Sequence, residues 1–404
     1  MARVGDCIFK AKRKDRHMNI LFYQHQFPAI GGMETVTATL ANAFTAEGHR
    51  VSILSHRSAE TIGESARVCQ GVTVFHMPGE EFLSARNTAF LQSTIKNYQI
   101  DLIIFQDSYA PIEKNLFTGE LAVPVVVCEH NSPFRVKSYE CSSQNPIRRL
   151  LGCLKFSLLR EHRYRKDGAR RRYLYERSEC YVLLSTRFFG EFRAVTRLAD
   201  TRKLMAIPNP YPGGSHILPN EKRNEVIFVA TLAPWKGCDL LLEAWRRICC
   251  QRLDWQLTIV GDGPERQKLE KMANEYGLKN VSFEGYRSDP TPYFGRAKIL
   301  AFPSRFEGWG LVLIEAMAKG CVPVAFDSYS SVHDIVQDNV NGIIVPAFDV
   351  AAYAVELLRL MQTPSRWELL QSHALITPQK FKTEVIVSRW KILLRAFQRG
   401  RTLI

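Results

Sequence analysis

Short apolar runs alternate with amphipathic stretches along most of this chain of 404 residues. The runs have the length of strands buried on both faces, and the stretches between them repeat with a helical period. This alternation favours an α/β fold, in which helices cover both faces of a parallel sheet. In the first half of the chain, the predicted strands cover residues 20–23, 51–54, 72–75, 102–105, 123–127 and 181–184.

The alternation starts again in the second half. Its predicted strands cover residues 226–229, 257–260, 281–283, 299–302 and 323–325. Its predicted helices cover residues 238–250, 264–276 and 311–319. Between the halves, residues 208–214 are rich in Pro, Gly and Asn, which break helices and strands and mark a linker. We therefore expect two doubly wound, Rossmann-like domains that face each other across a cleft, with ligands at the carboxyl ends of the strands.

These boundaries divide the chain into five parts. They are a basic N-terminal extension (1–17), a first domain (18–208), a linker (209–224), a second domain (225–380) and a C-terminal helix (381–404). We expect the last helix to pack back on the first domain. The N-terminal extension has little apolar surface to bury, so we expect it to be dispensable for folding.

The charge balance predicts an acidic partner. Lys and Arg outnumber Asp and Glu by 54 to 40, a net charge of +14, which suits a nucleic acid, an anionic membrane surface or a phosphate-bearing substrate. No apolar run approaches the roughly 18 residues of a membrane span, and the N-terminus lacks the apolar stretch of a signal peptide. The ten cysteines form no CxxC pair and suit neither zinc nor a disulfide framework, so we expect a reducing compartment.

The most informative segment for function is Pro303–Ala318, which follows a predicted strand and opens a predicted helix. Gly308 and Gly310 remove side chains where a ligand can approach the backbone, and free amides at a helix start attract anions. Glu307 and Glu315 are eight residues apart, so one can lie in the loop while the other projects from the helix. Isolated glutamates of this kind are usually solvated, and it is the surrounding glycines that favour a functional interpretation.

This segment resembles the Glu-x7-Glu signature of the retaining glycosyltransferases of family 4, which have two Rossmann-like domains in the GT-B arrangement. Five more segments are similar to motifs of that family and follow in the same order: Phe27–Glu34 (a glycine loop), Ala206–Pro210 (a Pro-Asn stretch), Pro234–Gly237 (a Lys-Gly pair), Ile259–Pro264 (a Gly-x-Gly-Pro turn) and Ser282–Tyr286 (the end of the base-binding strand). The resemblance covers roughly residues 19–395. Each motif alone is weak, whereas six in the right order are specific.

The resemblance implies roles for particular residues. Glu315 would hold the ribose hydroxyls of a nucleotide, Glu307 would contact the donor sugar, and Tyr286 would contribute to the donor site. Cleavage of a sugar–diphosphate bond leaves negative charge on the diphosphate, so the site needs hydrogen-bond donors aimed at that group. The groups expected to meet this charge are Lys236 and the backbone amides of Gly31, Gly32, Gly310, Leu311 and Val312.

His130 follows a strand of the first domain, where a histidine is by itself most often structural. Its position is similar to that of the family histidine beside the donor sugar, so we assign it to the catalytic group together with Glu307 and Lys236. The neighbouring Glu129 is either an acceptor-side group or only the polar end of the strand, and we favour the second interpretation.

One position departs from the family pattern. The family usually has Gly-Arg shortly before the site lysine, whereas this chain has Ala230 and Thr231. A guanidinium that would clamp the diphosphate is therefore missing. Either Arg305 or another group replaces it, or Lys236 and the backbone amides suffice.

A basic stretch over residues 147–177 contains eleven Lys or Arg, three acidic residues and several interleaved leucines. Such a segment predicts docking on an anionic membrane surface. Reversal of Arg170, Arg171 and Arg172 to glutamate is then expected to weaken docking. The alternative is a solvated helix whose leucines face the core. No RNA-binding or helix-turn-helix pattern accompanies the charge, so no nucleic acid is expected.

Together these features predict a metal-independent, retaining glycosyltransferase that uses a UDP-sugar as co-substrate and no other cofactor. It would move a hexose or N-acetylhexosamine to a lipid-linked glycan acceptor in polysaccharide biosynthesis, at the cytoplasmic face of the cell membrane. Two alternatives remain open: a sugar-nucleotide epimerase of the same fold, and a non-catalytic module that binds phosphate or nucleic acid. The departure at Thr231 is the best support for the second alternative.

Overall fold

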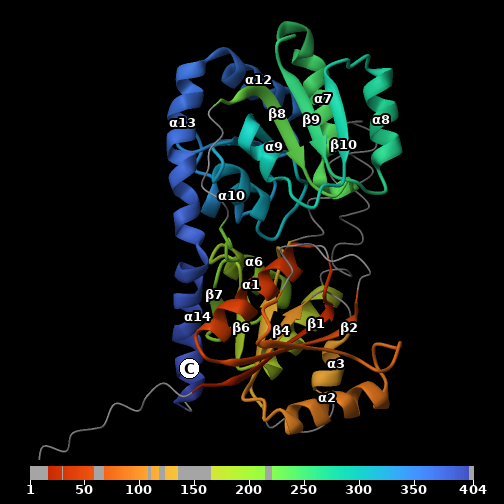
Figure 1. Ribbon diagram of the computed structural model, residues 1–404, viewed down its shortest axis with the longest axis vertical. Coiled ribbons are helices and arrows are strands. Elements are labelled where there is room, and N and C mark those ends of the chain that lie inside the picture. Colours follow the sequence, from red (N-terminus) through yellow and green to blue (C-terminus); the bar gives the residue numbers. More distant parts are fainter. Residues whose placement is uncertain are drawn as a thin grey trace, which may run out of the picture.

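The computed structural model describes residues 17–29, 31–58, 68–107, 111–117, 123–134, 165–213 and 221–399. Figure 1 shows two α/β domains stacked along the long axis of the molecule, with the last helices of the chain running along one side of both. The predicted fold class, two Rossmann-like domains in a GT-B arrangement, is confirmed. The N-terminal extension lies outside the described residues except for His17.

The first domain contains a seven-stranded sheet in the order β3-β2-β1-β4-β5-β6-β7, and every pairing in it is parallel. Its strands are β1 (Asn19–Gln26), β2 (Arg50–Arg57), β3 (Val72–His76), β4 (Leu102–Asp107), β5 (Val125–Glu129), β6 (Cys180–Leu183) and β7 (Leu204–Ala206). Its helices are α1 (Gly32–Ala46), α2 (Ala85–Asn97), α3 (Glu113–Leu116) and α6 (Phe188–Thr196), together with the helical residues 165–177.

The second domain contains a six-stranded parallel sheet in the order β10-β9-β8-β11-β12-β13. Its strands are β8 (Arg223–Val229), β9 (Gln256–Val260), β10 (Val281–Gly285), β11 (Ala297–Phe302), β12 (Val322–Asp327) and β13 (Ile343–Pro346). Its helices are α7 (Cys238–Ile248), α8 (Arg266–Glu275), α9 (Thr291–Arg296), α10 (Leu311–Met317), α11 (Val332–Ile335), α12 (Val350–Gln362) and α13 (Pro364–Ile376), with short 3-10 turns η2 (Pro234–Lys236), η3 (Cys249–Gln251) and η4 (Thr377–Phe381).

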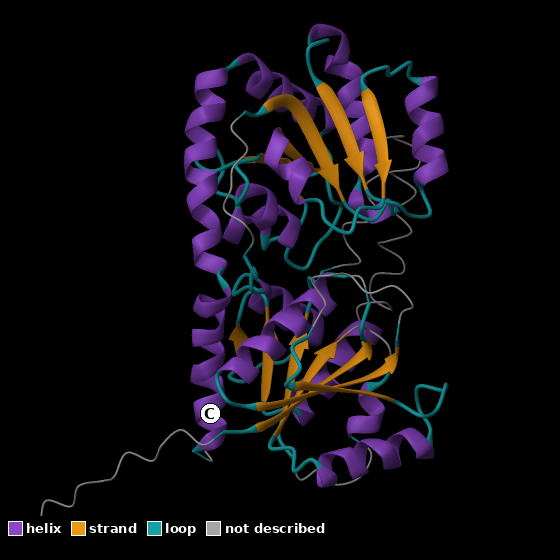
Figure 2. Cartoon of the chain, viewed as in Figure 1, coloured by secondary structure: helices purple, strands orange, loops and turns teal. Residues whose placement is uncertain are grey.

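The strands of both sheets end toward the junction between the domains, as the arrowheads in Figure 2 show. In each sheet the strand order reverses beside the first strand, because β1 lies between β2 and β4 and β8 lies between β9 and β11. Ligands of open parallel sheets bind at such reversals, outside the carboxyl ends of the strands. The topology therefore places both candidate binding regions at the junction.

The chain crosses between the domains at two adjacent points. The backbone N–H of Tyr211 donates to the carbonyl of Phe381 at 2.7 Å, so the outgoing and returning segments touch. Beyond this point α14 (Thr383–Gln398) lies on α1, with the rings of Trp390 and Phe44 6.0 Å apart and Lys391 Nζ 2.7 Å from Glu47 Oε2. The last helix thereby ties the end of the chain to the first domain.

Of the three arginines expected to take part in membrane docking, Arg171 is buried, and the half-buried Arg170 and Arg172 have partners within the domain. Arg170 pairs with Glu113 at 3.0 Å, and Arg172 donates to the carbonyl oxygen of Thr196 at 2.6 Å. Arg171 is buried and pairs with Glu129 at 2.6 Å, because this position lies on the face of the helix that is turned toward β5. All three arginines hold the helix to the domain. Residues 147–164 of the basic stretch lie outside the described residues.

Glu129 is thus a structural residue, the buried partner of Arg171, and it also accepts a hydrogen bond from the hydroxyl of Tyr181 at 2.9 Å. Removing one member of such a pair leaves the other charge buried without its counterion. Arg171→Met is therefore expected to lower the free energy of unfolding by about 3–5 kcal/mol, measured by urea denaturation.

The matched control for this prediction is Arg177→Met, on the same helix, where the guanidinium is exposed and lies over the ring of Tyr173. Equal unfolding free energies for the two variants would contradict a structural role for the Arg171–Glu129 pair.

Candidate active site

A cavity of about 310 Å³ lies between the two domains. Its lining residues come from both domains and the linker: Gly32, Met33, His130, Asn131, Asn209, Val229, Ala230, Thr231, Lys236, Phe302, Glu307, Gly308, Trp309, Gly310, Leu311 and Val312. Seven of the predicted site residues are in this set, namely Gly32, His130, Lys236, Glu307, Gly310, Leu311 and Val312. The structure therefore brings together residues that lie up to 280 positions apart in the sequence, from Gly32 to Val312.

Lys236 and Glu307 form an ion pair on the second-domain wall of the cavity. Lys236 Nζ lies 2.5 Å from Glu307 Oε1, and the hydroxyl of Ser304 donates to the same oxygen at 2.9 Å. Lys236 ends the 3-10 turn after β8, and Glu307 lies in the loop after β11, so the parallel sheet places both at its carboxyl edge. The carboxylate of Glu307 repels an anion that approaches Lys236. A ligand hydroxyl that donates a hydrogen bond to this carboxylate offsets the repulsion. A sugar attached to a phosphate supplies both groups.

Arg305 does not line the cavity, although its charge had made it a candidate for the diphosphate. Its guanidinium binds both carboxylate oxygens of Asp239 at 2.8 Å and the carbonyl of Pro234 at 2.6 Å. Its backbone N–H donates to the carbonyl of Trp235 at 2.8 Å. These contacts fix the turn that carries Lys236, so Arg305 acts here as a positioning residue.

The two glycines of the Glu-Gly-Trp-Gly segment are required for different reasons. A Cβ at Gly308 would lie 1.7 Å from the carbonyl oxygen of His130, so only glycine lets the two domains meet here. Gly310 precedes α10 with a φ of 89°, a left-handed conformation that favours glycine. The first contact brings the His130 loop beside Glu307, and the second directs the start of α10 toward the cavity.

His130 is oriented by Gln106 at the end of the neighbouring strand β4. The two side chains are 2.5 Å apart, and because an amide oxygen only accepts, His130 Nε2 carries the proton. Sequence analysis missed Gln106, because it lies 24 positions from His130 and only the pairing of β4 with β5 brings the two together. It also missed Ser304, which directly precedes the Glu307 loop.

Glu315 lies in α10 and is partly buried, but it is not among the residues that line the cavity. Burial raises the pKa of its carboxyl to about 7, and the charge of Asp289 adds to this shift. Among the described residues, none donates a hydrogen bond to it. Gly31 and Tyr286 also lie outside the lining, Gly31 as the N-cap of α1 and Tyr286 as a side chain that is 45% exposed just past β10.

Polar contacts outside the cavity lining hold the two domains together. The carboxylate of Glu191 accepts hydrogen bonds from Ser132 in the first domain at 2.9 Å and from Ser330 in the second at 2.6 Å. Arg187 pairs with Asp334 of the other domain at 3.3 Å. In the part of the chain that the structure describes, no group of three or more His, Cys, Asp or Glu side chains is arranged to hold a metal ion.

Two family descriptions match the chain on either side of the linker. "Glycosyltransferase Family 4" matches residues 30–211, and "Glycosyl transferases group 1" matches residues 216–374. The chain belongs to the family 4 glycosyltransferases.

Relatives and solved structures agree with this membership. An uncharacterized glycosyltransferase of Haemophilus influenzae is 24% identical over 92% of this chain and 99% of its own length. A Campylobacter jejuni transferase, named for adding N-acetylgalactosamine to an undecaprenol-diphosphate glycan, is 26% identical over 51% of this chain and 71% of its own length. The structure of Anabaena HepE with UDP and glucose has a TM-score of 0.71 at 21% identity, covering 94% of this chain and 99% of HepE.

Other curated relatives match over a smaller part. Five of them align with 39–47% of this chain, and the chain spans only 20–48% of their length. These matches support membership of the family and leave the substrate of this glycosyltransferase to be proposed.

The position of Arg305 generates a prediction for this glycosyltransferase. Arg305→Lys keeps the positive charge but loses the fork that binds Asp239, so the turn that carries Lys236 loosens. We expect kcat/KM for the donor to fall about ten- to a hundredfold, the cost of a small misplacement of a reacting group.

Donor hydrolysis kinetics measure this effect. The control is Arg247→Lys, at an exposed pair with Glu243 on α7. If Arg305→Lys only lowers the melting temperature and leaves donor kinetics unchanged, Arg305 does not position the site.

Proposed function

We propose that this protein is a retaining glycosyltransferase that moves a hexose or N-acetylhexosamine from a UDP-sugar to a lipid-linked glycan in bacterial polysaccharide assembly. The observation that carries the proposal is the junction cavity, where Lys236 and Glu307 of the second domain face His130 of the first. A cation, a carboxylate and an imidazole around one cavity match the needs of a sugar diphosphate.

The donor is proposed to lie with its diphosphate at Lys236 and its sugar at Glu307. When the bond from the anomeric carbon to the diphosphate breaks, its electron pair moves to the phosphate oxygen, and positive charge develops on the sugar ring. Lys236 and the amides at the start of α10 stabilise the leaving anion, and Glu307 and His130 contact the sugar. The UDP and glucose bound to HepE support a UDP-sugar, since that protein shares the fold.

The acceptor hydroxyl is proposed to attack from the face that the diphosphate leaves, so that the anomeric configuration is retained. Its proton then passes to the departing phosphate oxygen, which balances the charge of the step. The name of the Campylobacter relative supports a lipid-linked glycan as the acceptor. No residue beyond those of the cavity is needed for this sequence of events.

Membrane docking stays part of the proposal, and it now depends on the exposed basic residues of the stretch 147–177. On the helical residues 165–177 these are Arg165, Lys166 and Arg177. No helix of the described residues is long and apolar enough to cross a bilayer. Sedimentation with phosphatidylglycerol vesicles at low salt, reversed by added salt and weakened by Lys166→Glu, is the measurement for docking at the cytoplasmic membrane face.

The experiment that tests the proposed function is a screen of UDP- and GDP-sugars for nucleotide release in the presence of EDTA. We expect UDP release that persists without a divalent ion, because Lys236 and backbone amides meet the diphosphate charge. Lys236→Ala and Glu307→Ala should each lower the rate about a hundredfold, the loss expected for one electrostatic contact to the transition state.

Lys268→Ala, at an exposed lysine of α8, is the control for this screen. Activity that returns only with magnesium or manganese would overturn metal independence. A rearranged free sugar without acceptor would identify an epimerase, and an inverted linkage by NMR would overturn retention.

The raised pKa of Glu315 predicts how nucleotide binding depends on pH. Ribose hydroxyls donate better to a carboxylate than to a neutral carboxyl, so bound UDP favours the ionised form. UDP affinity should therefore rise as the pH increases through about 7, which is the pKa of the Glu315 carboxyl in the protein without UDP. Calorimetric titration at several pH values measures this.

Glu315→Gln separates this effect from ionisation of the nucleotide itself, because the variant keeps the phosphate but has no carboxyl to titrate. It should bind UDP more weakly and lose the part of the pH dependence that belongs to Glu315. An identical pH profile in the parent and the variant would remove Glu315 from the ribose site.

A further inference from the structure

Two histidines lie opposite each other at the carboxyl ends of β1 and β2, outside the donor cavity. The register pairs Gln24 with Ser55 and Gln26 with Arg57, so His25 lies beside His56. Both imidazoles contact the ring of Phe82, with centroids 5.1 and 5.7 Å away. Nothing in the proposed donor chemistry uses this pair.

The contacts of Tyr23 favour one tautomer of His56. The hydroxyl of Tyr23 lies 3.1 Å from the carbonyl of Ile112, 3.2 Å from the amide nitrogen of Asn115 and 2.7 Å from His56 Nε2. The hydroxyl has one proton, the carbonyl can only accept and the amide N–H can only donate, so all three contacts are hydrogen bonds only when His56 Nε2 carries a proton. The tautomer that satisfies all three contacts leaves Nδ1 as a hydrogen-bond acceptor.

Two nitrogen atoms of this pair have no partner. His56 Nδ1 and His25 Nε2 are buried, and neither has a hydrogen-bond partner among the described residues. Buried polar atoms are nearly always paired, so unpaired ones call for an explanation such as a ligand. Burial, followed by the charges of His25 and Arg57, lowers the pKa of His56 to about 4, and burial and Arg57 also lower the pKa of His25. Both rings are neutral near pH 7.

A neutral nitrogen that accepts hydrogen bonds limits which ligand groups can bind to it. The lone pair of His56 Nδ1 attracts an O–H or N–H group and repels an anion. The exposed Arg57, whose guanidinium lies 5.0 Å from the Phe82 ring, is the nearby cation that an anion would use instead. The pair itself is therefore suited to a hydroxyl-bearing ligand.

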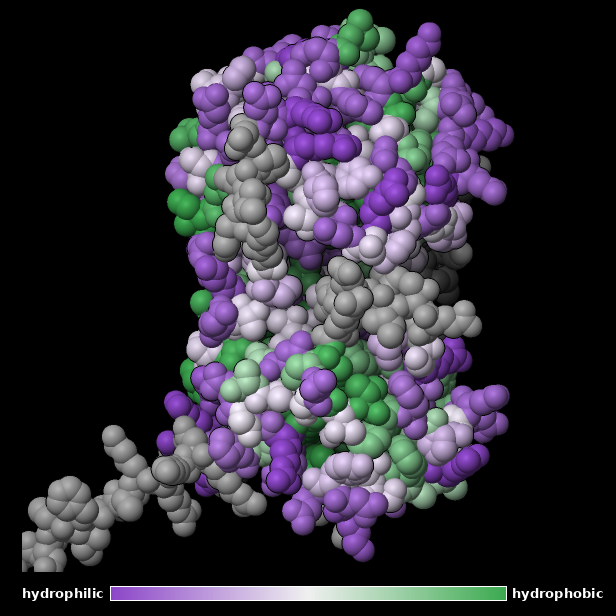
Figure 3. Space-filling view, in the orientation of Figure 1, coloured by the Kyte–Doolittle hydropathy of each residue, from purple (hydrophilic) through white to green (hydrophobic). Residues whose placement is uncertain are grey.

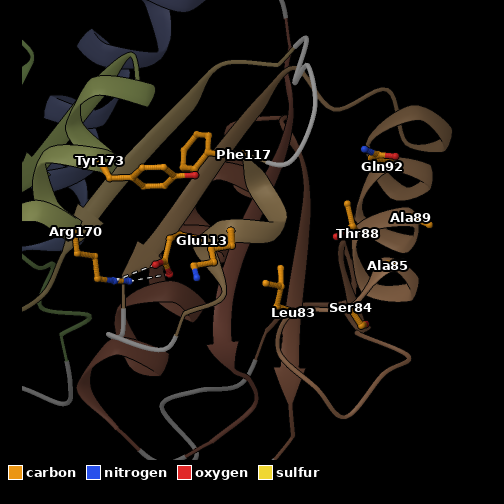
Figure 4. A pocket seen from close by; sticks show the side chains of 11 residues that line it. Leu83, Ser84, Ala85, Thr88, Ala89, Gln92, Glu113, Phe117, Arg170 and Tyr173 are labelled. Carbon is orange, nitrogen blue, oxygen red and sulfur yellow. Dashed lines mark hydrogen bonds and ion pairs between the residues drawn. The ribbon is translucent and has the colours of Figure 1, made fainter.

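The position of the pair fits the acceptor rather than the donor. The segment that follows β1 leads within a few residues to Gly32 in the donor cavity, so both sites lie at the same end of that strand. On its other side, the pair adjoins an apolar pocket of about 900 Å³ between α2, α3 and the helical residues 165–177. Figure 4 shows Leu83 and Thr88 on one side of this pocket and Phe117 and Tyr173 on the other.

The pair and the pocket are linked through Phe82 and Asn115, which do not line the pocket themselves. Phe82 of the pair directly precedes Leu83 of the pocket, and the amide of Asn115 donates to the carbonyl of Phe82 at 2.6 Å. Hydrophobic residues also show on this domain in the space-filling view, below the junction (Figure 3). A glycoside with an apolar aglycone would find a hydroxyl-binding site and an apolar surface next to each other.

We propose that His25 and His56 bind hydroxyl groups of a neutral sugar in the acceptor, with His56 Nδ1 accepting a hydrogen bond from one of them. This inference rests on the proposed glycosyltransferase function and adds the acceptor subsite to it. The two histidines act as binding residues and take no part in breaking the donor bond.

The first test needs no variant. Octyl glucoside, octyl galactoside and their N-acetylhexosamine counterparts are added to the protein labelled with ¹⁵N-histidine, in the presence of UDP. We expect the resonance of His56 Nδ1 to shift with at least one neutral glycoside, because it gains a hydrogen-bond donor. No shift with any of these glycosides would overturn the proposal.

The second test compares two substitutions that divide the functions of the ring. In His56→Gln, the side-chain amide still reaches the hydroxyl of Tyr23 but leaves no acceptor at the Nδ1 position. In His56→Asn, the shorter side chain places its amide oxygen near the Nδ1 position. We expect octyl glycoside affinity to fall about tenfold in His56→Gln, the loss of one hydrogen bond to a buried acceptor, and to be largely kept in His56→Asn. His373→Gln, at an exposed histidine of α13, is the control.

The outcomes separate this inference from the proposed function. UDP titrations on the same samples report the donor site, so a protein that binds no UDP would refute the donor assignment and not the acceptor subsite. Equal glycoside affinity in all three variants would overturn the role of His56. Binding of glycerol phosphate that is lost in Arg57→Gln, with no binding of neutral glycosides, would show an anion site instead.

Discussion

The contact between Gly308 and the carbonyl of His130 is the constraint on which the junction depends. A side chain at position 308 would collide with that carbonyl, at a distance of 1.7 Å from its Cβ. Because the position is glycine, the loop after β5 reaches the loop after β11, and His130 comes to the same cavity as Glu307. The crossing at Tyr211 and Phe381 and the packing of α14 on α1 then hold the domains in this arrangement.

Two arginines that the sequence had made candidates for ligand binding hold structure instead. Arg171 is buried against Glu129, and Arg305 is bound to Asp239 beneath the turn that carries Lys236. A planar guanidinium suits such sites because it forms two parallel hydrogen bonds with a carboxylate. The charge left for a ligand in the cavity is a lysine, whose flexible stem lets it follow a diphosphate. In this site an arginine thus positions the turn, and a lysine remains available to bind the ligand.

The sequence predicts this fold well because strands of a parallel sheet are continuous apolar runs, and nearly all the long ones were placed within a few residues. It missed the short edge strands β7 and β13, of three and four residues. The site residues Lys236, Glu307 and His130 were found from motifs. Motifs did not reveal three other features: the contact of Gln106 with His130, the burial of Arg171, and the unpaired nitrogens of His25 and His56. Each of these depends on contacts between strands or helices that are far apart in the sequence.

The two sides of the junction differ in the electrostatics that they offer a ligand. The second domain presents Lys236 paired to Glu307, a fixed separation of charge that suits a sugar carrying a phosphate. The first domain presents imidazoles whose pKa values burial lowers, so they stay neutral and offer hydrogen bonds without charge. Under the proposed assignment, selection between the two substrates follows from charge: the diphosphate is drawn to Lys236 of one domain, and an uncharged hydroxyl is bound by the neutral imidazoles of the other.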